Sequence, residues 1–321
     1  MAGPNLTIDR TARIDALEAG GVLRTGPVAV TAGGKGVNVV RAARRLGARA
    51  TLVGVVAGRI GQATAQLLAD EGVDLVQVEV DGETRSTAIL IEPGGRTTVI
   101  NEPGPMIDAD RWRNHRSAVI ERLSGTSALV CSGSAPPGTP LDAYGDLVRA
   151  AQEREVLAVV DAGGPLLAAA LEARAELVAP NLAEAEGVLE GGGPERVAVS
   201  DDAASRASQA AAELVARGAR IAMVTAAAAG VAVAWRGGAR WIAAPRVEVV
   251  NPIGAGDSFT AAAALRLAAG DEPVTAAAAA VAAGAAAVET ALAGDLDAHR
   301  AASLLTGEKT SGGRGGASPF T

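Results

Sequence analysis

The chain has 321 residues, of which 49% are hydrophobic, so it is long enough to build one large α/β domain around a substantial core. Its net charge of −7 argues against general nucleic-acid binding, which needs a basic surface. The single cysteine, Cys131, excludes an internal disulfide and a cysteine zinc cluster. The chain has only two histidines, which are far apart in the sequence, so a histidine-rich metal site is not expected.

Targeting and membrane segments are not visible in the sequence. No signal peptide is seen at the start, and the alanine run at 276–287 is interrupted by Gly284 and too weakly apolar to span a bilayer. We therefore expect a soluble, cytoplasmic protein that binds neither a membrane nor nucleic acid. The Gly/Ser-rich stretch 307–321 is expected to be a disordered tail.

The first hundred residues predict short strands and two helices. Few residues precede Pro4, so a first strand before Asp9 would be very short. Residues 11–30 look extended, with a turn at Gly20-Gly21. The later elements expected here are helices at 37–46 and 61–71 and strands at 51–56, 75–80, 86–91 and 97–100. Residues 11–30 and 75–101 are expected to form a small β unit set apart from the main body.

From residue 108 onward, helices and strands alternate. Helices are expected at 110–123, 141–154, near 166 and at 202–216, and strands at 128–131, 156–161, 177–179 and 221–225. This alternation predicts a parallel sheet covered on both faces, with a site at the carboxyl ends of the strands. The residues that follow predicted strands, and that would share one crevice, are Ser132, Asp161, Asn181, Thr225 and Asp257.

The stretch Asn251–Phe259 follows a strand-like run at 241–250 and opens an alanine-rich helix. Gly254 and Gly256 permit a tight turn, and the first amides of the helix form an anion site because they lack partners. Asp257 in the same turn would repel a merely bound phosphate. It makes sense if Asp257 takes a proton from a hydroxyl that attacks a phosphoryl group. From these residues alone, a glycine turn with Asp257 as a helix cap is equally open.

Other motifs narrow the chemistry. No Walker A loop and no Gly-x-Gly-x-x-Gly after a first strand is present, which disfavours a P-loop and a dinucleotide site. Asn181 and Glu184 share a helix face and can orient Mg²⁺ waters near a nucleotide, although a solvated helix start is the favoured interpretation of this pair alone. Arg85 suits phosphate oxygens only if the substrate is phosphorylated. Cys131 is expected to be a core residue.

Two glycine turns together resemble a known family. Gly33-Gly34-Lys35-Gly36-Val37-Asn38 and Gly254-Ala255-Gly256-Asp257 resemble the paired signatures of the ribokinase-like sugar kinases, the phosphofructokinase B family, over roughly residues 3–305. Further segments are similar to 1-phosphofructokinases and tagatose-6-phosphate kinases: Pro4-Asn5, Thr84-Arg85, 101–105, 132–138 and Asn251-Pro252. Arg85 separates these from ribokinase, because phosphosugar kinases of the family place an arginine against the substrate phosphate.

The resemblance implies a three-layer α/β/α kinase domain over residues 1–306, with a mostly parallel central sheet and a β-sheet lid at about 11–30 and 75–101. It implies ATP and Mg²⁺ as cofactors and a phosphorylated ketohexose as acceptor, foremost fructose 1-phosphate giving fructose 1,6-bisphosphate. Tagatose-6-phosphate or 6-phosphofructokinase activity on the same fold is the alternative, and a non-catalytic sugar-phosphate sensor is another. Because lids of this family often pair between subunits, a homodimer through the lid is expected.

The resemblance also implies a role for each matching residue. Asp257 would be the general base, and the amides of Gly254, Ala255, Gly256 and Asp257 the anion hole. Substrate contacts are implied for Asp9, Gly34, Lys35, Asn38, Arg85 and Ser132, of which Lys35 and Arg85 would hold the sugar phosphate. Nucleotide contacts are implied for Asn181, Thr225, Gly230, Gly254 and Gly256, with Glu184 orienting Mg²⁺.

Two departures from the family pattern matter. The first strand is shorter than usual, which is expected to weaken that edge of the sheet. The family's glycine after the nucleotide-site threonine is Ala227 here, and its methyl group is expected to crowd the nucleotide.

Overall fold

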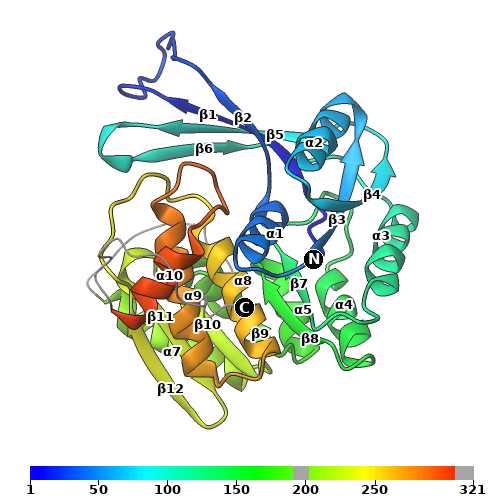
Figure 1. Ribbon diagram of the computed structural model, residues 1–321. Helices are drawn as coiled ribbons and strands as arrows, with labels where there is room; N and C mark the ends of the chain where they lie inside the picture. Colours follow the sequence, from blue (N-terminus) through cyan, green and yellow to red (C-terminus); the bar gives the residue numbers. More distant parts are fainter. Residues whose placement is uncertain (191–201, 308–321) are drawn as a thin grey trace.

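The computed structural model describes residues 1–190 and 202–307, and a long twisted sheet runs through the main body (Figure 1). Its parallel strands are β7 (Ala128–Ser132), β8 (Leu157–Asp161), β9 (Leu177–Val178) and β10 (Ile221–Thr225). The strands β11 (Gly230–Trp235) and β12 (Gly238–Ala243) continue it as an antiparallel edge. The expectation of a mostly parallel central sheet is confirmed.

The N-terminal residues lie inside this sheet and not at its edge. β3 (Thr51–Ala57) pairs in parallel with β4 (Asp74–Val80), and Ala2 bridges β3 to β7 by parallel pairing with Val53 and Cys131. The Ala2 amide donates to the Val130 carbonyl at 2.8 Å, and the Gly3 amide donates to that of Val53 at 3.1 Å. The weakened edge expected from the short first strand is therefore wrong, because three residues suffice to join the two parts of the sheet.

Helices cover both faces of the sheet. One layer comprises α3 (Ala109–Glu121), α4 (Ala143–Gln152), α5 (Gly164–Glu172), α6 (Leu182–Glu190) and α7 (Ala203–Ala216). The other comprises α1 (Lys35–Arg45), α8 (Ala255–Ala268), α9 (Pro273–Val288) and α10 (Ala298–Thr306). Successive strand residues point to opposite cores, so Val160 packs under α4 and α5 while Val159 packs under α8. The three-layer architecture is thus confirmed.

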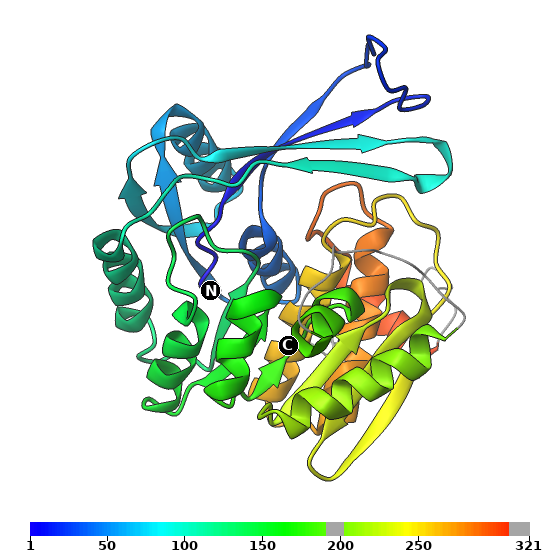
Figure 2. The same cartoon turned by 180° about the vertical axis from the view of Figure 1, so that it is seen from behind.

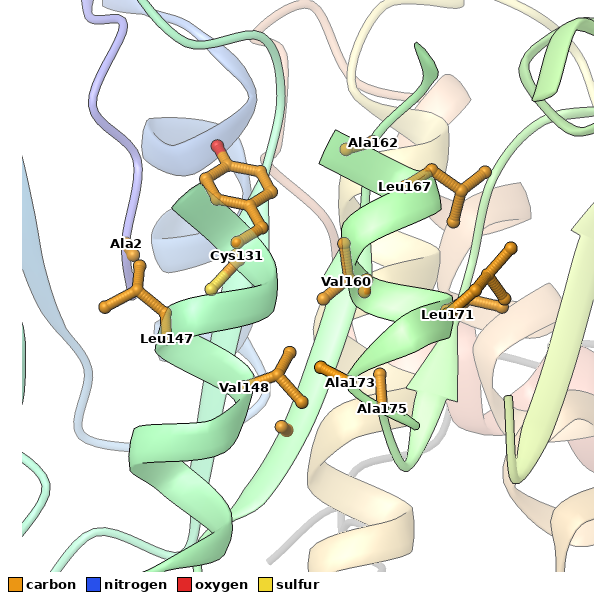
Figure 3. Packing of buried hydrophobic residues seen from close by; sticks show 14 of the residues in the cluster. Ala2, Cys131, Leu147, Val148, Val160, Ala162, Leu167, Leu171, Ala173 and Ala175 are labelled. Atoms are coloured by element: carbon orange, nitrogen blue, oxygen red, sulfur yellow. The ribbon is translucent and has the colours of Figure 1, made fainter. Parts of the chain in front are cut away.

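The two cores are filled by different side chains. Figure 3 shows Val160 of β8 between α4, which carries Leu147 and Val148, and α5, which carries Leu167 and Leu171. On the other face, every buried residue of α9 except Val281 is alanine. Such short side chains let α8 and α9 approach each other closely, which accounts for a large core with few aromatic residues.

A separate four-stranded sheet stands beside the body and projects beyond it (Figure 2). Its order is β2 (Ala29–Gly33), β1 (Thr7–Arg13), β5 (Arg85–Ile91) and β6 (Thr97–Asn101), with β1 parallel to β5. The helix α2 (Gly58–Asp70) lies between this sheet, which we call the lid, and β3. The expectation that the strand at 75–80 belongs to the lid is wrong. The half-buried strand β4 belongs to the main sheet, where Val78 and Val80 join the core beneath α3.

Three further segments differ from expectation or fall outside the structure. Only residues 241–243 of the strand-like run 241–250 lie in a strand, because Pro245 has no amide to continue the pairing of β12. The strand β11 was not anticipated. Of the tail expected at 307–321, only Gly307 is among the described residues, where it ends α10 in a left-handed conformation. Within the described ranges, no helix is long and apolar enough to cross a membrane.

Candidate active site

A cleft of about 1220 Å³ lies between the lid and the carboxyl ends of the parallel strands. The lid contributes Asp9, Arg85, Thr87 and Asn101, and the strand ends contribute Ser132, Asp161, Asn181 and Thr225. The starts of α1 and α8 contribute Gly34, Lys35, Asn38, Gly254, Ala255, Gly256 and Asp257. All five residues expected to share a crevice therefore line the same cleft.

Asp257 lies in the first turn of α8 and is 5% exposed. Gly254 precedes the helix with φ 86°, a left-handed conformation that a side chain would disfavour. Within the described part of the chain no side chain caps α8, so its first amides, at Ala255 and Gly256, have no partner and lie at the cleft. These amides and the helix dipole favour an anion next to the carboxylate of Asp257.

The charge state of Asp257 is set by its burial and its neighbours. Burial raises the pKa of Asp257 to about 7, and the nearby carboxylates of Asp161 and Glu184 act in the same direction. Lys35 and the hydrogen bond from Asn38 oppose this shift. A carboxylate with a pKa near the working pH is suited to accepting a proton from an alcohol.

Lys35 holds two carboxylates together in the middle of the cleft. Its Nζ lies 3.1 Å from Asp161 Oδ1 and 3.0 Å from Glu184 Oε1. Burial alone would lower the pKa of Lys35, but Asp161, Glu184 and Asp257 raise it above its usual value. The Ser132 hydroxyl donates to Asp161 Oδ2 at 2.9 Å, so Ser132 is bound to a carboxylate and not turned outward. The lysine is thus positively charged and tied to α6.

Asn181 and Glu184 form a reciprocal cap at the start of α6. The Glu184 amide donates to Asn181 Oδ1, and the Asn181 amide donates to Glu184 Oε2, both at 2.9 Å. The pair therefore caps the start of a helix, as expected for these two residues alone. Glu184 Oε1 in addition accepts a hydrogen bond from Lys35. Burial raises the pKa of Glu184, with Asp161 adding to the shift and Lys35 opposing it.

The carboxylates of the cleft can bind magnesium only together with the phosphates of a nucleotide. No group of three or more metal-ligating side chains occurs within residues 1–190 and 202–307. Magnesium bound to nucleotide phosphates needs only one or two protein carboxylates, because waters and phosphate oxygens complete the octahedron. Glu184 and Asp161, which share Lys35 as a counter-ion, can supply these carboxylates.

The lid end of the cleft carries polar atoms that lack partners. Among the described residues, Asn5 Oδ1, Asp9 Oδ1 and Arg85 Nε are buried without a hydrogen bond. Arg85 also donates to Asn101 Oδ1 at 3.1 Å and to the Asn5 carbonyl at 3.4 Å. Burial raises the pKa of Asp9 and lowers that of Arg85, and each residue offsets the shift of the other. Unpaired donors and acceptors at one place suit a ligand with hydroxyl and anionic groups.

The opposite end of the cleft is lined by Thr225 and Ala227. Thr225 ends β10 and pairs with Asn181 through an isolated bridge. Ala227 has φ 48°, a left-handed conformation that is unfavourable for alanine. Gly230 lies farther back, where it begins β11 and pairs with Ala243. Its expected contact with a nucleotide stays a prediction that the cleft geometry does not support.

One buried residue next to the site was not anticipated. Arg41 donates from Nη1 to Asn38 Oδ1 at 3.3 Å, three residues earlier on the same face of α1. The spacing Asn-x-x-Arg is the only feature of the sequence that could have indicated this contact. The same segment, Val37-Asn38-Val39-Val40-Arg41, is equally compatible with a helix whose arginine is exposed.

Comparisons with known proteins match most of this chain. Residues 5–299 match the model of the pfkB family of carbohydrate kinases. The chain is 34% identical over 239 residues to ATP-dependent 6-phosphofructokinase isozyme 2 of Escherichia coli, a match covering 74% of each chain. It is 28% identical over 187 residues to a tagatose-6-phosphate kinase of Staphylococcus epidermidis, covering 58% of this chain and 60% of that one. The crystal structure of Escherichia coli phosphofructokinase-2 in complex with potassium superposes with a TM-score of 0.83 at 28% identity, covering 95% of this chain and 97% of that one.

Proposed function

Because the chain belongs to the pfkB family of carbohydrate kinases, we propose that it transfers the terminal phosphoryl group of ATP to a hydroxyl of a phosphorylated ketohexose. The observation that carries this proposal is the buried carboxylate of Asp257 beside the unpaired amides of α8. These two features supply a proton acceptor and an anion hole at one point of the cleft.

The proposed reaction uses the residues of this point directly. Asp257 accepts the proton of the acceptor hydroxyl while the alcohol oxygen forms a bond to the terminal phosphorus of ATP. The bond from that phosphorus to the bridging oxygen breaks, and ADP leaves with the bonding electron pair. The amides of Gly254, Ala255 and Gly256 stabilise the charge on the transferring group. Glu184 and Asp161 would hold magnesium, which would supply positive charge to offset that of the nucleotide phosphates.

The other end of the cleft supports a phosphorylated acceptor. Asp9 Oδ1 can accept from a sugar hydroxyl, and the buried Nε of Arg85, which has no hydrogen-bond partner, can donate to an anion. Lys35 is engaged with Asp161 and Glu184, so Arg85 carries most of the discrimination for the sugar phosphate in this proposal. Gly34 and Asn38 would contact the sugar between these two ends.

Two kinds of acceptor compete. The motifs Thr84-Arg85 and Asn251-Pro252 are similar to those of both 1-phosphofructokinases and tagatose-6-phosphate kinases, and the two relatives described above are a 6-phosphofructokinase and a tagatose-6-phosphate kinase. Fructose 1-phosphate phosphorylated at O6 and fructose 6-phosphate phosphorylated at O1 both give fructose 1,6-bisphosphate, so the product does not distinguish them. Tagatose 6-phosphate would give a different bisphosphate.

The test is ADP release measured with a panel of acceptors. The panel holds fructose 1-phosphate, fructose 6-phosphate, tagatose 6-phosphate, and free fructose and ribose, each with ATP and Mg²⁺. We expect turnover with at least one phosphorylated ketohexose at a kcat/KM above that of every free sugar. Preference for a free sugar would overturn the assignment of the acceptor.

A non-catalytic sugar-phosphate sensor is the second candidate, and Ala227 is the observation that favours it. Its methyl group lines the end of the cleft that we assign to the nucleotide. A sensor would bind a sugar phosphate in calorimetry without any ADP release over the whole panel. The unpaired amides beside Asp257 favour the kinase, because sensing needs neither a base nor an anion hole.

We also infer a homodimer formed through the lid. On the lid face opposite the cleft, Val30, Arg10, Ala88 and Ile100 form one row across the four strands. Val30 is 40% exposed and Ile100 is 58% exposed, which is costly for a sheet that projects into solvent. A solved relative, phosphofructokinase-2 of Escherichia coli, is tetrameric in its inhibited form. Light scattering should report a dimer that Ile100→Arg converts to a monomer and that Leu141→Arg, outside the lid, leaves intact.

A further inference from the structure

Arg41 is a buried arginine that lies behind the catalytic turn and is 5% exposed. Its Nε and Nη2 donate to the two carboxylate oxygens of Glu71, each at 2.6 Å. Nη2 also donates to the Ala32 carbonyl at 2.7 Å, and Nη1 donates to Asn38 Oδ1 at 3.3 Å and to the Ala293 carbonyl at 3.2 Å. Arg41 is not among the residues that line the cleft, so it acts only through its neighbours.

The contact with Asn38 decides which end of that side-chain amide faces the base. An asparagine amide presents a donor at Nδ2 and an acceptor at Oδ1, and a flip exchanges them. The guanidinium of Arg41 can only donate, so it holds Oδ1 and turns Nδ2 toward Asp257. Asn38 Nδ2 donates to Asp257 Oδ2 at 2.8 Å. The opposite orientation would place two oxygens against each other and leave a buried carboxylate without this donor.

We propose that Arg41 is a positioning residue that fixes the Asn38 amide and thereby the orientation of the Asp257 carboxylate. The inference deepens the proposed function and rests on the role of Asp257 as the base.

The remaining contacts of Arg41 hold the backbone around the same turn. The Ala293 carbonyl, which accepts from Arg41, precedes Gly294. A Cβ atom at Gly294 would lie 2.5 Å from the Cα of Asn38, and one at Gly254 would lie 2.4 Å from the Gly294 amide nitrogen. The loop at Ala293-Gly294 therefore packs tightly between Asn38 and Gly254, and both of these residues are next to Asp257. One guanidinium thus fixes this loop, the Asn38 amide and the end of lid strand β2 at Ala32.

The test compares Arg41→Met with the wild-type enzyme over a range of pH. Loss of a hydrogen bond to a charged group predicts a kcat that is about 10- to 100-fold lower. Without a fixed donor from Asn38, the midpoint at which kcat/KM rises with pH should also move upward. The other charged groups that face Asp257 are Asp161, Glu184 and Lys35, and the substitution leaves all three in place.

Two variants separate positioning from general packing. Glu71→Gln keeps an oxygen acceptor for Arg41 but removes the charge of its ion-pair partner, and it should leave the pH midpoint unchanged. Arg44→Met removes an exposed arginine on the same helix that donates to the Glu71 carbonyl at 2.9 Å, and it should also leave the midpoint unchanged. A merely structural Arg41 would predict the same midpoint in all variants. If Arg41→Met does not fold, Arg41→Met with Glu71→Met removes both charges together and is measured in its place.

A crystal structure of the variant gives a readout that does not depend on activity. We expect the Asn38 amide to rotate away from Asp257, with loss of the 2.8 Å contact. An unchanged amide together with an unchanged pH midpoint would overturn the positioning role. If the wild-type protein released no ADP while the variant showed the rotated amide, the proposed function would fail and the positioning of Asn38 by Arg41 would stand.

Discussion

Asn38 of α1 donates a 2.8 Å hydrogen bond to Asp257 of α8, joining two helix starts that are 219 residues apart in the chain. Each of these helices begins at a glycine turn, and each turn alone reads equally well as a structural feature. Their side chains meet at the point where a buried carboxylate adjoins unpaired amides. This contact makes the two motifs one site.

Replacing the base should abolish most activity without harming the fold. Asp257→Asn keeps the shape and the contact with Asn38 but cannot accept a proton, so we expect kcat to fall about 10²- to 10⁴-fold. ADP release with the best acceptor of the panel measures the loss, and circular dichroism checks the fold. Asp70→Asn, an exposed aspartate on α2, makes the same charge change and should be neutral. Near-normal turnover of the Asp257 variant would exclude this base.

The pH dependence of activity should report the same carboxylate. Because burial raises the pKa of Asp257 to about 7 and the ionised form is the base, kcat/KM should rise with pH through about 7 and then level off. The rise should be absent from the residual activity of Asp257→Asn. A rate that is flat from pH 5 to 9 in the wild-type enzyme would contradict the assignment.

Stability should depend on pH with the opposite sign. The folded protein binds the Asp257 proton more tightly than the unfolded chain does, so the free energy of unfolding falls as the pH rises from about 4 to about 7. Asp257→Asn removes this term and should melt several degrees higher than the wild type at pH 8. The difference should vanish near pH 4, as followed by thermal melts. Equal melting temperatures at pH 8 would mean that the carboxylate is not destabilised by burial.

The lid arginine should act on the sugar phosphate alone. Arg85→Ala removes a charge-assisted contact, so KM for the phosphorylated acceptor should rise about 10- to 100-fold while KM for ATP changes little. Initial rates at varied acceptor concentration measure the effect. Arg96→Ala removes a lid arginine that pairs with Glu92 away from the cleft and serves as the control. An unchanged KM for the acceptor in Arg85→Ala would remove its assigned role.

Ala227 should be a site of strain that glycine relieves. Its φ of 48° disfavours a side chain, so Ala227→Gly should raise the free energy of unfolding by about 1 kcal/mol. The same change removes a methyl group from the cleft and should lower KM for ATP. Ala228→Gly, in the same turn but without a positive φ, should instead destabilise the protein. Chemical unfolding and ATP titrations test both variants, and equal shifts in the two would refute the strain.

Local pattern was enough to predict much of the fold. Alternation of helices and strands after residue 108 predicted the parallel sheet, and the residues that end its strands, from Ser132 to Thr225, line one cleft as expected. These predictions succeeded because the spacing of buried residues along a helix or strand is set by the geometry of that element alone, and can therefore be read from the local sequence. The two glycine turns likewise marked the helix starts that enclose the site.

Pairing between distant segments was decided only by the tertiary structure. The alternation of β4 shows that it is a half-buried strand, yet the same pattern fits the lid and the main sheet, and only its partner β3 distinguishes them. The three residues around Ala2 are too few to be read as a strand but join two parts of the sheet.

The candidate site follows the same division. The sequence determined which residues carry charge or open a helix, including Asp257, Lys35 and Arg85. It could not show that Lys35 binds Asp161 and Glu184, or that Arg41 is buried against Asn38. Those contacts depend on the distance between segments far apart in the chain, and the spacing of residues along one segment carries no information about that distance.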